Sequence, residues 1–387
     1  MINQVLYRKY RPKTFEEIEG QEHVVRTLRG ALLSGRVGHA YLFCGPRGTG
    51  KTTMARLLAK ALNCFYRLQV TGYRLQEKEH GLKPDTWHLK PDSVEPCNSC
   101  HSCTEINAGR SLDLIEIDAA SNRGIDEIRN LKESAQVAAT GGGYKIFIVD
   151  ECHMLTREAN NALLKLLEEP SSHVVFVLAT TEPHKVPDTV LSRVQRFDFK
   201  KISGEAIAKK LREIAKQEKL QIDDDALTVI ASSASGSLRD AESSLNKLIA
   251  YSGPLRQSSS EASAKITNEH VTEALGIVSY HIHQKLLELI KQKNGQEAIA
   301  QVAYLYENGV DMDNFVKQFV KYLRTKLIGL LSQTIAASSA QSEPSQTRIE
   351  PEFLIKVINL FIKAGSELKF SPMPQLPVEL AILELTK

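Results

Sequence analysis

The chain has 387 residues, of which 42% are hydrophobic and 25% are charged, and its formal net charge is +3. This length allows two or three domains with separate cores, and the composition is ordinary for a globular protein rather than a disordered one. So small a net charge excludes nucleic-acid binding by the global field alone, and any such contact must come from a local patch.

Two further properties of the sequence concern its compartment. No apolar run reaches about 18 residues, and the first residues lack the apolar segment of a signal peptide. We therefore expect a cytoplasmic protein that is neither secreted nor inserted into a membrane. Six cysteines occur, three of them clustered. Without a secretion signal, such cysteines favour metal binding over disulfides.

The chain begins with a basic segment that a proline interrupts. Arg8, Lys9 and Arg11 could contact a nucleotide, a neighbouring subunit or only water, and charge alone favours water. Thr14 followed by Glu17 matches a capping box, which predicts a short helical turn.

The most informative stretch is a glycine-rich loop between an apolar strand and a helix. Residues 39–45 predict a buried strand, and the letters GPRGTGKT that complete the motif G-x-x-x-x-G-K-[ST] follow at once. The backbone N–H groups of such a loop surround phosphates, Lys51 reaches the β- and γ-phosphates, and Thr52 supplies a hydroxyl to Mg²⁺. The predicted nucleotide-binding residues are Gly45, Pro46, Arg47, Gly48, Thr49, Gly50, Lys51 and Thr52.

After this helix, residues 63–103 interrupt the alternation of strands and helices. The letters PCNSCHSC contain two C-x₂-C steps, and with one earlier cysteine they supply four thiolates for tetrahedral Zn²⁺. Four cysteines leave no position for a substrate, which indicates a structural site. His80, His88 and His101 are weaker candidate ligands. The predicted zinc ligands are Cys64, Cys97, Cys100 and Cys103.

A second buried strand, 144–149, ends in two carboxylates. Because α/β sheets bind ligands at the carboxyl ends of their strands, we expect Asp150 to hold Mg²⁺ and Glu151 to orient and deprotonate the attacking water. A third strand, 174–178, is followed by Thr180, whose hydroxyl could contact the γ-phosphate or that water.

A short helix then reaches Arg193, which could pair with a carboxylate in its own domain or act as an arginine finger on a neighbour's nucleotide. Sequence alone leaves the two roles equal. Strands separated by helices predict a parallel sheet covered on both faces. From Ser203 the pattern is all helical, and Arg239 opens one helix. It could lie over the bound nucleotide or pair with Asp240.

With these motifs in place, the chain resembles the gamma/tau subunits of bacterial DNA polymerase III, the clamp-loader AAA+ ATPases. The resemblance covers essentially the whole chain. It rests on motifs such as LYRKYRPKTFEEIEGQEHV, HAYLFCGPRGTGKTT, PCNSCHSC, DLIEIDAASNRGIDEIR, VDECHML and GSLRDA. It implies an AAA+ domain with a parallel sheet over 1–202 that contains a zinc module over 63–103. A helical lid over 203–253, a linker over 254–267 and a helical collar over 268–387 complete the implied order.

The resemblance also implies roles for single residues. Thr180 matches sensor 1, Arg193 the trans-acting finger, Arg239 sensor 2, and the four cysteines the zinc ligands. Where the family has Ser-Arg-Cys this chain has Val194 after the arginine, a change that spares the charge. The stretch between the first and second zinc cysteines is longer than usual, and the role of residues 65–96 stays open.

The implied function is ATP-driven loading of a sliding clamp onto primed DNA. The implied partners are delta-type and delta-prime-type loader subunits, copies of this chain, the clamp, and DNA held through its backbone. Arg123 and Arg129, near the helix start at 122–125, are candidate DNA contacts. The family's long form continues into polymerase- and helicase-binding segments, so we expect this chain to load clamps without bridging those two proteins.

Three alternatives differ from this interpretation. A scaffold could use nucleotide and zinc only for structure, but it would not need Lys51, Asp150, Glu151 and Arg193 together. Another AAA+ nucleic-acid motor, such as a Holliday-junction motor, would need no Cys₄ insertion. A metabolic phosphate-loop kinase would lack both the trans arginine and the helical C-terminal half.

Overall fold

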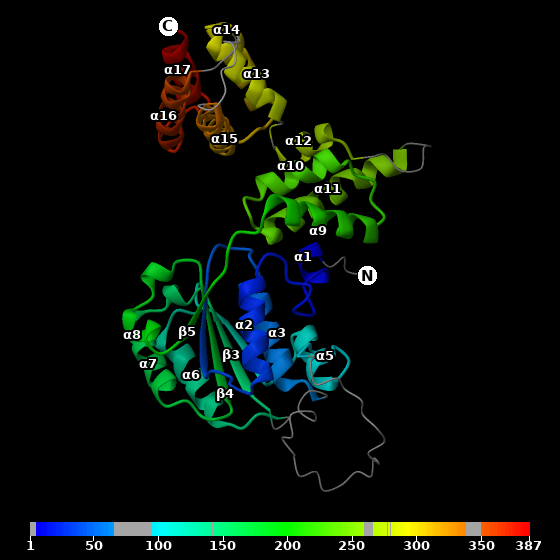
Figure 1. Ribbon diagram of the computed structural model, residues 1–387, viewed down its shortest axis with the longest axis vertical. Helices are drawn as coiled ribbons and strands as arrows, with labels where there is room; N and C mark the ends of the chain where they lie inside the picture. Colours follow the sequence, from blue (N-terminus) through cyan, green and yellow to red (C-terminus); the bar gives the residue numbers. More distant parts are fainter. Residues whose placement is uncertain are drawn as a thin grey trace. The chain divides into compact units, whose positions relative to one another are not determined.

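The computed structural model describes residues 5–65, 94–140, 143–258, 266–276, 278, 280–337 and 350–387. It divides into two compact units (Figure 1). The first comprises Met1–Lys210 with Ala234–Ser243, and the second comprises Leu211–Ser233 with Ser244–Lys387. Among the described residues, no helix has both the length and the apolar character needed to cross a membrane.

The first unit is built on a five-stranded sheet in the order β2-β3-β4-β1-β5, and all four strand pairings are parallel. The strands are β1 (Ala40–Cys44), β2 (Leu114–Asp118), β3 (Lys145–Asp150), β4 (Val174–Thr180) and β5 (Gln195–Asp198). β1 lies between β4 and β5, so the strand order reverses next to it. In open parallel sheets this switch point is where ligands bind.

Helices cover both faces of the sheet, as Figure 1 shows. Apolar side chains of α2 (Glu22–Leu33) and α3 (Lys51–Asn63) pack on one face with Tyr41 and Phe43 of β1. Those of α6 (Ile125–Gln136) and α7 (Arg157–Glu168) pack on the other face with Leu42. Alternate residues of one strand thus enter opposite cores, which explains why β1, β3 and β4 are apolar runs. The predicted α/β sheet is confirmed.

The remaining helices of the first unit are short. They are α1 (Leu6–Lys9), α5 (His101–Ala108), α8 (Asp188–Leu191) and the two 3₁₀ turns η1 (Cys152–Met154) and η2 (Pro183–Lys185). A short turn forms after Thr14, where the N–H of Ile18 donates to the carbonyl of Phe15 at 3.3 Å, but the capping box predicted to begin it is wrong. The Glu17 carboxylate instead accepts the N–H of Lys13 at 2.7 Å.

Four helices follow the sheet: α9 (Gly204–Gln217), α10 (Asp224–Ser233), α11 (Leu238–Ser258) and α12 (Asn268–Leu275). Helix α11 continues through Gly253 and Pro254, so the start of the stretch expected to be a linker is helical. Residues 259–265 of the expected linker lie outside the described part of the chain. Ile222 and Ile266 form a parallel β-bridge that joins the segment before α10 to the segment before α12.

The C-terminal part of the second unit is a separate helical bundle. It contains α13 (Tyr280–Lys291), α14 (Gly295–Glu307), α15 (Met312–Ala337), α16 (Pro351–Glu367) and α17 (Leu376–Thr386). Its core is almost entirely aliphatic and aromatic, with Phe315, Phe319 and Phe361 fully buried. The described residues after Ser203 are mainly helical, as predicted from the change of pattern there.

Candidate nucleotide site and cysteine cluster

The phosphate loop joins β1 to α3 and is packed closely on both sides. Gly45 has φ +145° and Gly48 has φ +73°. A Cβ at Gly45 would lie 2.4 Å from the carbonyl oxygen of Phe199, and one at Gly48 would lie 2.0 Å from Oγ of Ser237. The N–H of Leu238 donates to the carbonyl of Gly48 at 3.1 Å. Glycine is therefore required sterically at these two positions, and the loop is held against the start of α11.

Lys51 opens α3 and is only 6% exposed. Its ammonium donates to the carbonyls of Gly45 at 2.7 Å and Pro46 at 2.8 Å. Burial lowers the pKa of Lys51, while the nearby carboxylates of Glu151 and Asp150 act in the opposite direction. A buried cation at a helix N-terminus favours an anionic ligand, as the sequence motif predicts.

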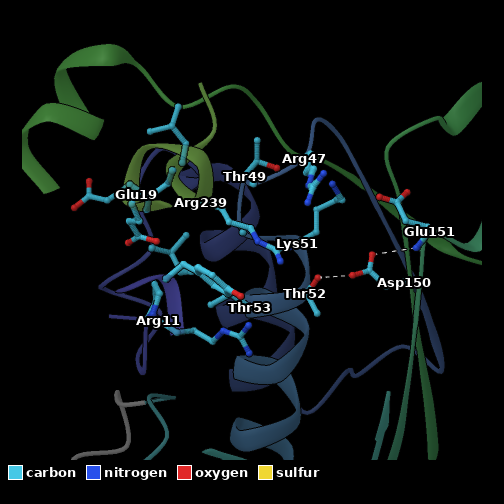
Figure 2. Close-up of a pocket in the computed structure, with 18 of the residues that line it drawn as sticks. Arg11, Glu19, Arg47, Thr49, Lys51, Thr52, Thr53, Asp150, Glu151 and Arg239 are labelled. Carbon is cyan, nitrogen blue, oxygen red and sulfur yellow. Dashed lines mark hydrogen bonds between the residues drawn. The ribbon is translucent and has the colours of Figure 1, made fainter. Parts of the chain in front are cut away.

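Thr52 and Asp150 meet at the carboxyl edge of the sheet (Figure 2). The Thr52 hydroxyl donates to Oδ2 of Asp150 at 2.9 Å, and Oδ1 of Asp150 accepts the N–H of Glu151 at 3.0 Å. A hydroxyl and a carboxylate at this separation are the oxygen ligands that Mg²⁺ prefers. The residues thus fit the predicted cation.

Glu151 lies beside Asp150, but its side chain is turned in a different direction (Figure 2). Its backbone has φ +49°, a left-handed conformation that is uncommon outside glycine. Its carboxylate accepts both the N–H of Thr181 at 3.1 Å and the hydroxyl of Thr181 at 2.8 Å. In this structure Thr181 therefore holds Glu151.

Thr180 and Thr181, at the end of β4, both lie outside the described lining of the cavity, and the role expected for Thr180 stays a prediction. Thr180 is fully buried, its hydroxyl lies 2.9 Å from Nδ1 of His153, and it accepts the N–H of Glu182. Side chains alternate along a strand, so two consecutive residues at its end face opposite ways. Thr181 is the residue that reaches the predicted catalytic carboxylate.

The phosphate loop, Lys51, Thr52, Asp150 and Glu151 line one cavity of about 450 Å³. Its opposite wall comes from two distant segments. The N-terminal segment contributes Tyr7, Arg11, Pro12, Ile18 and Glu19, and the start of α11 contributes Leu238, Arg239 and Glu242. The Arg239 guanidinium lies over the Tyr7 ring, 4.9 Å from its centroid, which is a cation–π contact. Arg239 thus lines the cavity, which corresponds to one of the two positions that the sequence left open. The sequence analysis did not identify Tyr7 or Glu242 as site residues. For Arg11, charge alone had favoured a solvent-exposed role over a nucleotide contact.

Glu242 is a buried carboxylate in this wall, 5% exposed. Burial raises its pKa to about 7, although the charges of Lys210 and Arg11 oppose the shift. No sequence pattern marks this residue, because its environment is created by segments far away in the chain.

Arg193 follows α8 and does not belong to the described lining of the cavity. Its guanidinium donates to Glu168 at 2.7 Å and to the carbonyl of Thr189 at 2.7 Å. The side chain is about one-third exposed. Within one chain, therefore, Arg193 makes the local ion pair that the sequence left open.

The four predicted zinc cysteines are brought together. Their Sγ atoms all lie within 4.8 Å of one another. Tetrahedral coordination at about 2.3 Å requires S–S separations near 3.8 Å, so the cluster fits zinc. The Cys97 sulfur accepts the N–H groups of Ser99 at 3.5 Å and Cys100 at 3.3 Å. His101 is 86% exposed and pairs with Glu105. His80, His88 and most of the open stretch 65–96 lie outside the described residues.

The candidate DNA contacts lie at the exposed start of α6. Arg123 donates to the carbonyl of Ala120 at 3.0 Å, and Arg129 pairs with Asp126 at 3.0 Å. Residues 121–124 are exposed.

A phosphate loop at the switch point of a parallel sheet, with carboxylates at the end of the neighbouring strand and a helical lid after the sheet, defines an AAA+ nucleotide-binding protein. Three family descriptions match successive parts of the chain. "DNA polymerase III, delta subunit" matches residues 20–71 and 82–203, and "DNA polymerase III clamp loader subunit, ATPase lid domain" matches 206–254. "DNA polymerase III subunits gamma and tau domain III" matches 266–387.

Curated relatives agree with these matches. The DNA polymerase III subunit tau of Bacillus subtilis is 38% identical over 100% of this chain and 63% of its own length. The subunit tau of Escherichia coli is 36% identical over 99% of this chain and 55% of its own length. The chain belongs to the gamma/tau family of DNA polymerase III subunits. It spans roughly half to two-thirds of the length of these relatives.

Among solved structures, the chain is similar to the RuvB Holliday junction branch migration motor of Thermotoga maritima. The TM-score is 0.46 and the sequence identity 16%, over 72% of this chain and 79% of that one.

Proposed function

We propose that this chain is an ATP-driven motor subunit of a DNA polymerase III clamp loader. It would bind and hydrolyse ATP at subunit interfaces and thereby load the sliding clamp onto primed DNA. The observation that carries the proposal is the convergence of Lys51, Thr52, Asp150 and Glu151 on one cavity at the switch point of the sheet. Membership of the gamma/tau family supplies the biological context.

The phosphate end of the cavity has a defined role for each group. The loop N–H groups and Lys51 hold the β- and γ-phosphates. Thr52 and Asp150 hold Mg²⁺, directly or through water. When bound, that ion neutralises charge on the phosphate oxygens. Arg239 and Tyr7 close the opposite side of the cavity.

Glu151 orients and deprotonates the attacking water. To do so it must leave Thr181, which binds its carboxylate through both an N–H and a hydroxyl. The proposed resting state therefore keeps the base away from the water, and activation includes its release. We therefore also assign Thr181, at the end of β4, to this site.

Arg193 would complete the site of a neighbouring subunit. Its pair with Glu168 is half exposed, and such pairs are worth at most about 1 kcal/mol, so a neighbour's phosphate can replace the carboxylate. An arginine supplied across an interface accelerates phosphoryl transfer by roughly 10³–10⁵. Hydrolysis would then depend on assembly, with delta-type and delta-prime-type subunits and copies of this chain as neighbours.

The remaining parts follow the family expectation. Residues 1–202 would form the ATPase domain, 203–253 the lid and 268–387 the collar that joins subunits. Cys64, Cys97, Cys100 and Cys103 would hold a structural zinc ion in the zinc module. Arg123 and Arg129 at the start of α6 would contact the DNA backbone, and the protein would act in the cytoplasm.

The test is the ATP hydrolysis rate of this chain assembled with partner loader subunits and the sliding clamp, with and without primed DNA. Arg193→Ala is compared with Arg196→Ala, which removes another exposed arginine that pairs with a carboxylate, Asp198. We expect DNA to raise the wild-type rate, Arg193→Ala to abolish the response, and Arg196→Ala to keep it. A rate that ignores DNA, clamp and Arg193 would instead indicate a nucleotide-binding scaffold.

A further inference from the structure

The cysteine cluster belongs to a module whose contacts reach beyond the four sulfurs. We define the cysteine module as residues 94–108 together with Cys64, which follows the last residue of α3. Val94 and Ile106 of the module are buried in the same core as Phe15 and α2. The module is thus packed against the N-terminal segment and is not an isolated surface loop.

A small hydrogen-bond network joins the module to α3 and to the N-terminal segment. Lys60, near the end of α3, is 2% exposed. Its ammonium donates to the carbonyl of Lys13 at 2.8 Å and to Oδ1 of Asn98 at 2.7 Å. The amide of Asn98 in turn donates to the same Lys13 carbonyl at 3.1 Å. A buried ammonium is tolerated only with such partners, so the three groups hold one another in place.

Asn98 reaches this hydrogen-bond network because of its position within the cysteine motif. It directly follows Cys97 and has φ +57°, so its backbone conformation is part of the turn that brings the sulfurs together. A change in the cysteine cluster would therefore move the Asn98 side chain directly.

A second contact fixes the next residues of the same segment. The Phe15 N–H donates to a carboxylate oxygen of Glu95 at 2.6 Å. The other Glu95 oxygen is buried and lies 3.7 Å from Arg29 on α2. Phe15 itself is 1% exposed. The module therefore holds the backbone of residues 13–15 at two points, a carbonyl and an N–H.

The residues on either side of this fixed point line the nucleotide cavity. Arg11 and Pro12 precede it, and Ile18 and Glu19 follow it. Figure 2 shows Arg11 and Glu19 among the side chains on the wall opposite Asp150 and Glu151. A backbone that is free at residues 13–15 would have to be ordered when ligand binds, at a cost of roughly 1–2 kcal/mol per residue.

We propose that the cysteine module is a structural support for the nucleotide pocket. With its cysteines joined by a metal ion, the module holds residues 13–15 through Asn98 and Glu95 and so keeps the wall from Arg11 to Glu19 preformed for the nucleotide. This inference rests on the proposed nucleotide and metal sites, and it gives the module a role in nucleotide affinity that is separate from the phosphate loop.

Three variants separate this support from the metal itself. Asn98→Gly keeps the positive φ angle but removes the side-chain hydrogen bonds to Lys60 and Lys13, together with weaker ones to Pro96 and Asn107. Lys60→Met keeps most of the buried side-chain volume but removes the ammonium. The double variant removes the charge together with its partner, so it lacks the penalty of an unpaired buried charge. Thr104→Ala is the matched control, because the side chain of this exposed residue on α5 donates to the carbonyl of His101 in its own helix.

The measurements are bound zinc, the Kd for an N-methylanthraniloyl derivative of ADP with Mg²⁺, and the rate of tryptic cleavage after Lys13, which Thr14 follows. We expect both single variants and the double variant to keep zinc, to raise Kd at least threefold and to be cleaved faster, whereas Thr104→Ala matches wild type. Wild type stripped of metal should show the same rise in Kd.

A change in Kd smaller than threefold in the zinc-bound variants would overturn the proposal, as would metal-free wild type that binds nucleotide as tightly as the metal-bound form. If the purified wild type holds no metal, the metal assignment fails, while the Asn98 and Lys60 variants still test the support. If wild type binds no nucleotide, the proposed function fails first.

Discussion

The two compact units of this chain differ in what they bury. Within the described residues, ten polar or charged residues are buried, and His283 alone of these belongs to the second unit. The others are Gln21, Thr49, Lys51, Lys60, Asn63, Lys145, Thr180, Ser237 and Glu242. Burying polar groups costs free energy unless partners are supplied. Thr49, Lys51 and Glu242 of the first unit line the nucleotide cavity, and others such as Gln21, Lys60 and Asn63 bond to distant backbone groups. The second unit is specified mainly by apolar packing.

Backbone conformation shows the same contrast. In the first unit, Glu151 with φ +49° and Gly48 with φ +73° surround the phosphate site, and Asn98 with φ +57° lies in the cysteine cluster. In the C-terminal bundle, the residues with positive φ, Lys293 and Gly309, end helices. Such conformations are common at helix ends, whereas at a ligand site they serve function.

The largest effect should come from the catalytic carboxylate of the first unit. Glu151→Gln removes the base and should lower single-turnover ATP hydrolysis by about 10²–10⁴ while nucleotide Kd stays near wild type. Glu158→Gln on exposed α7 is the control and should change neither quantity. Full hydrolysis by Glu151→Gln would remove this residue from the mechanism.

The second unit should respond most to loss of apolar volume. Phe361 is fully buried, and its ring lies 4.7 Å from that of Phe319. Phe361→Ala should destabilise the bundle by about 3–5 kcal/mol in denaturant titrations, with unchanged nucleotide Kd. Phe370→Ala, at an 87% exposed position, should cost less than about 0.5 kcal/mol. Altered Kd in Phe361→Ala would show that the two units are coupled.

His283, a buried polar residue of the second unit, should make the stability of that unit sensitive to acid. Burial lowers the pKa of His283 to about 4, and its ring stacks on Phe315, Phe319 and Tyr322. In the unfolded chain this histidine has a pKa near 6.5, so the unfolded state takes up a proton before the folded state does. The free energy of unfolding therefore has its full value above pH 6.5 and decreases as pH falls toward 4. The loss amounts to about 3 kcal/mol.

The free energy of unfolding of His283→Phe should not show this decrease between pH 6.5 and 4. His281→Gln, which changes an exposed neighbour, should keep it. An unchanged pH profile in His283→Phe would mean that the histidine is not the group that titrates.

Glu242 should make the stability of the first unit depend on pH by a similar amount but with the opposite sign. Its folded pKa of about 7 lies above the model-peptide value of 4.5, because the carboxyl group is buried. The folded state therefore binds the proton more tightly, and its stability falls as pH rises from about 4.5 to 7. Without nucleotide at pH 8, Glu242→Gln should be more stable than wild type by up to about 3 kcal/mol.

Glu133→Gln, on the exposed side of α6, provides the comparison for Glu242→Gln and should leave the pH profile as it is. A Glu242→Gln protein that is less stable than wild type at pH 8 would show that the ionised carboxylate is instead stabilised by Arg11 and Lys210.

Sequence predicted those parts of the site that local patterns encode. The phosphate loop, the carboxylates after β3 and the C-x₂-C steps each depend on neighbours within a few residues, and the structure places them as a site. Thr180 and Thr181 could not be separated, because the face that each presents depends on the register of β4. Tyr7 and Glu242 lie more than two hundred residues apart in sequence, and only tertiary packing brings them to one wall.

The capping box failed for a similar reason. Thr14 and Glu17 match the pattern locally, but distant groups take the backbone positions around them. Lys60 binds the carbonyl of Lys13, and Glu95 binds the N–H of Phe15. A local turn still forms, with the N–H of Ile18 donating to the carbonyl of Phe15, but long-range hydrogen bonds take the place of the capping bonds, and a single sequence does not reveal them.

The central claim is that Arg193 acts on the neighbouring subunit, although within one chain it pairs with Glu168. The most direct test mixes two inactive proteins, Glu151→Gln and Arg193→Ala, in one assembled loader with clamp and primed DNA. If Arg193 acts across the interface, a Glu151→Gln subunit supplies the arginine to an Arg193→Ala neighbour that keeps its base. The mixture should then hydrolyse ATP faster than either protein alone. A mixture as inactive as its components would contradict the account and place Arg193 in its own subunit's chemistry.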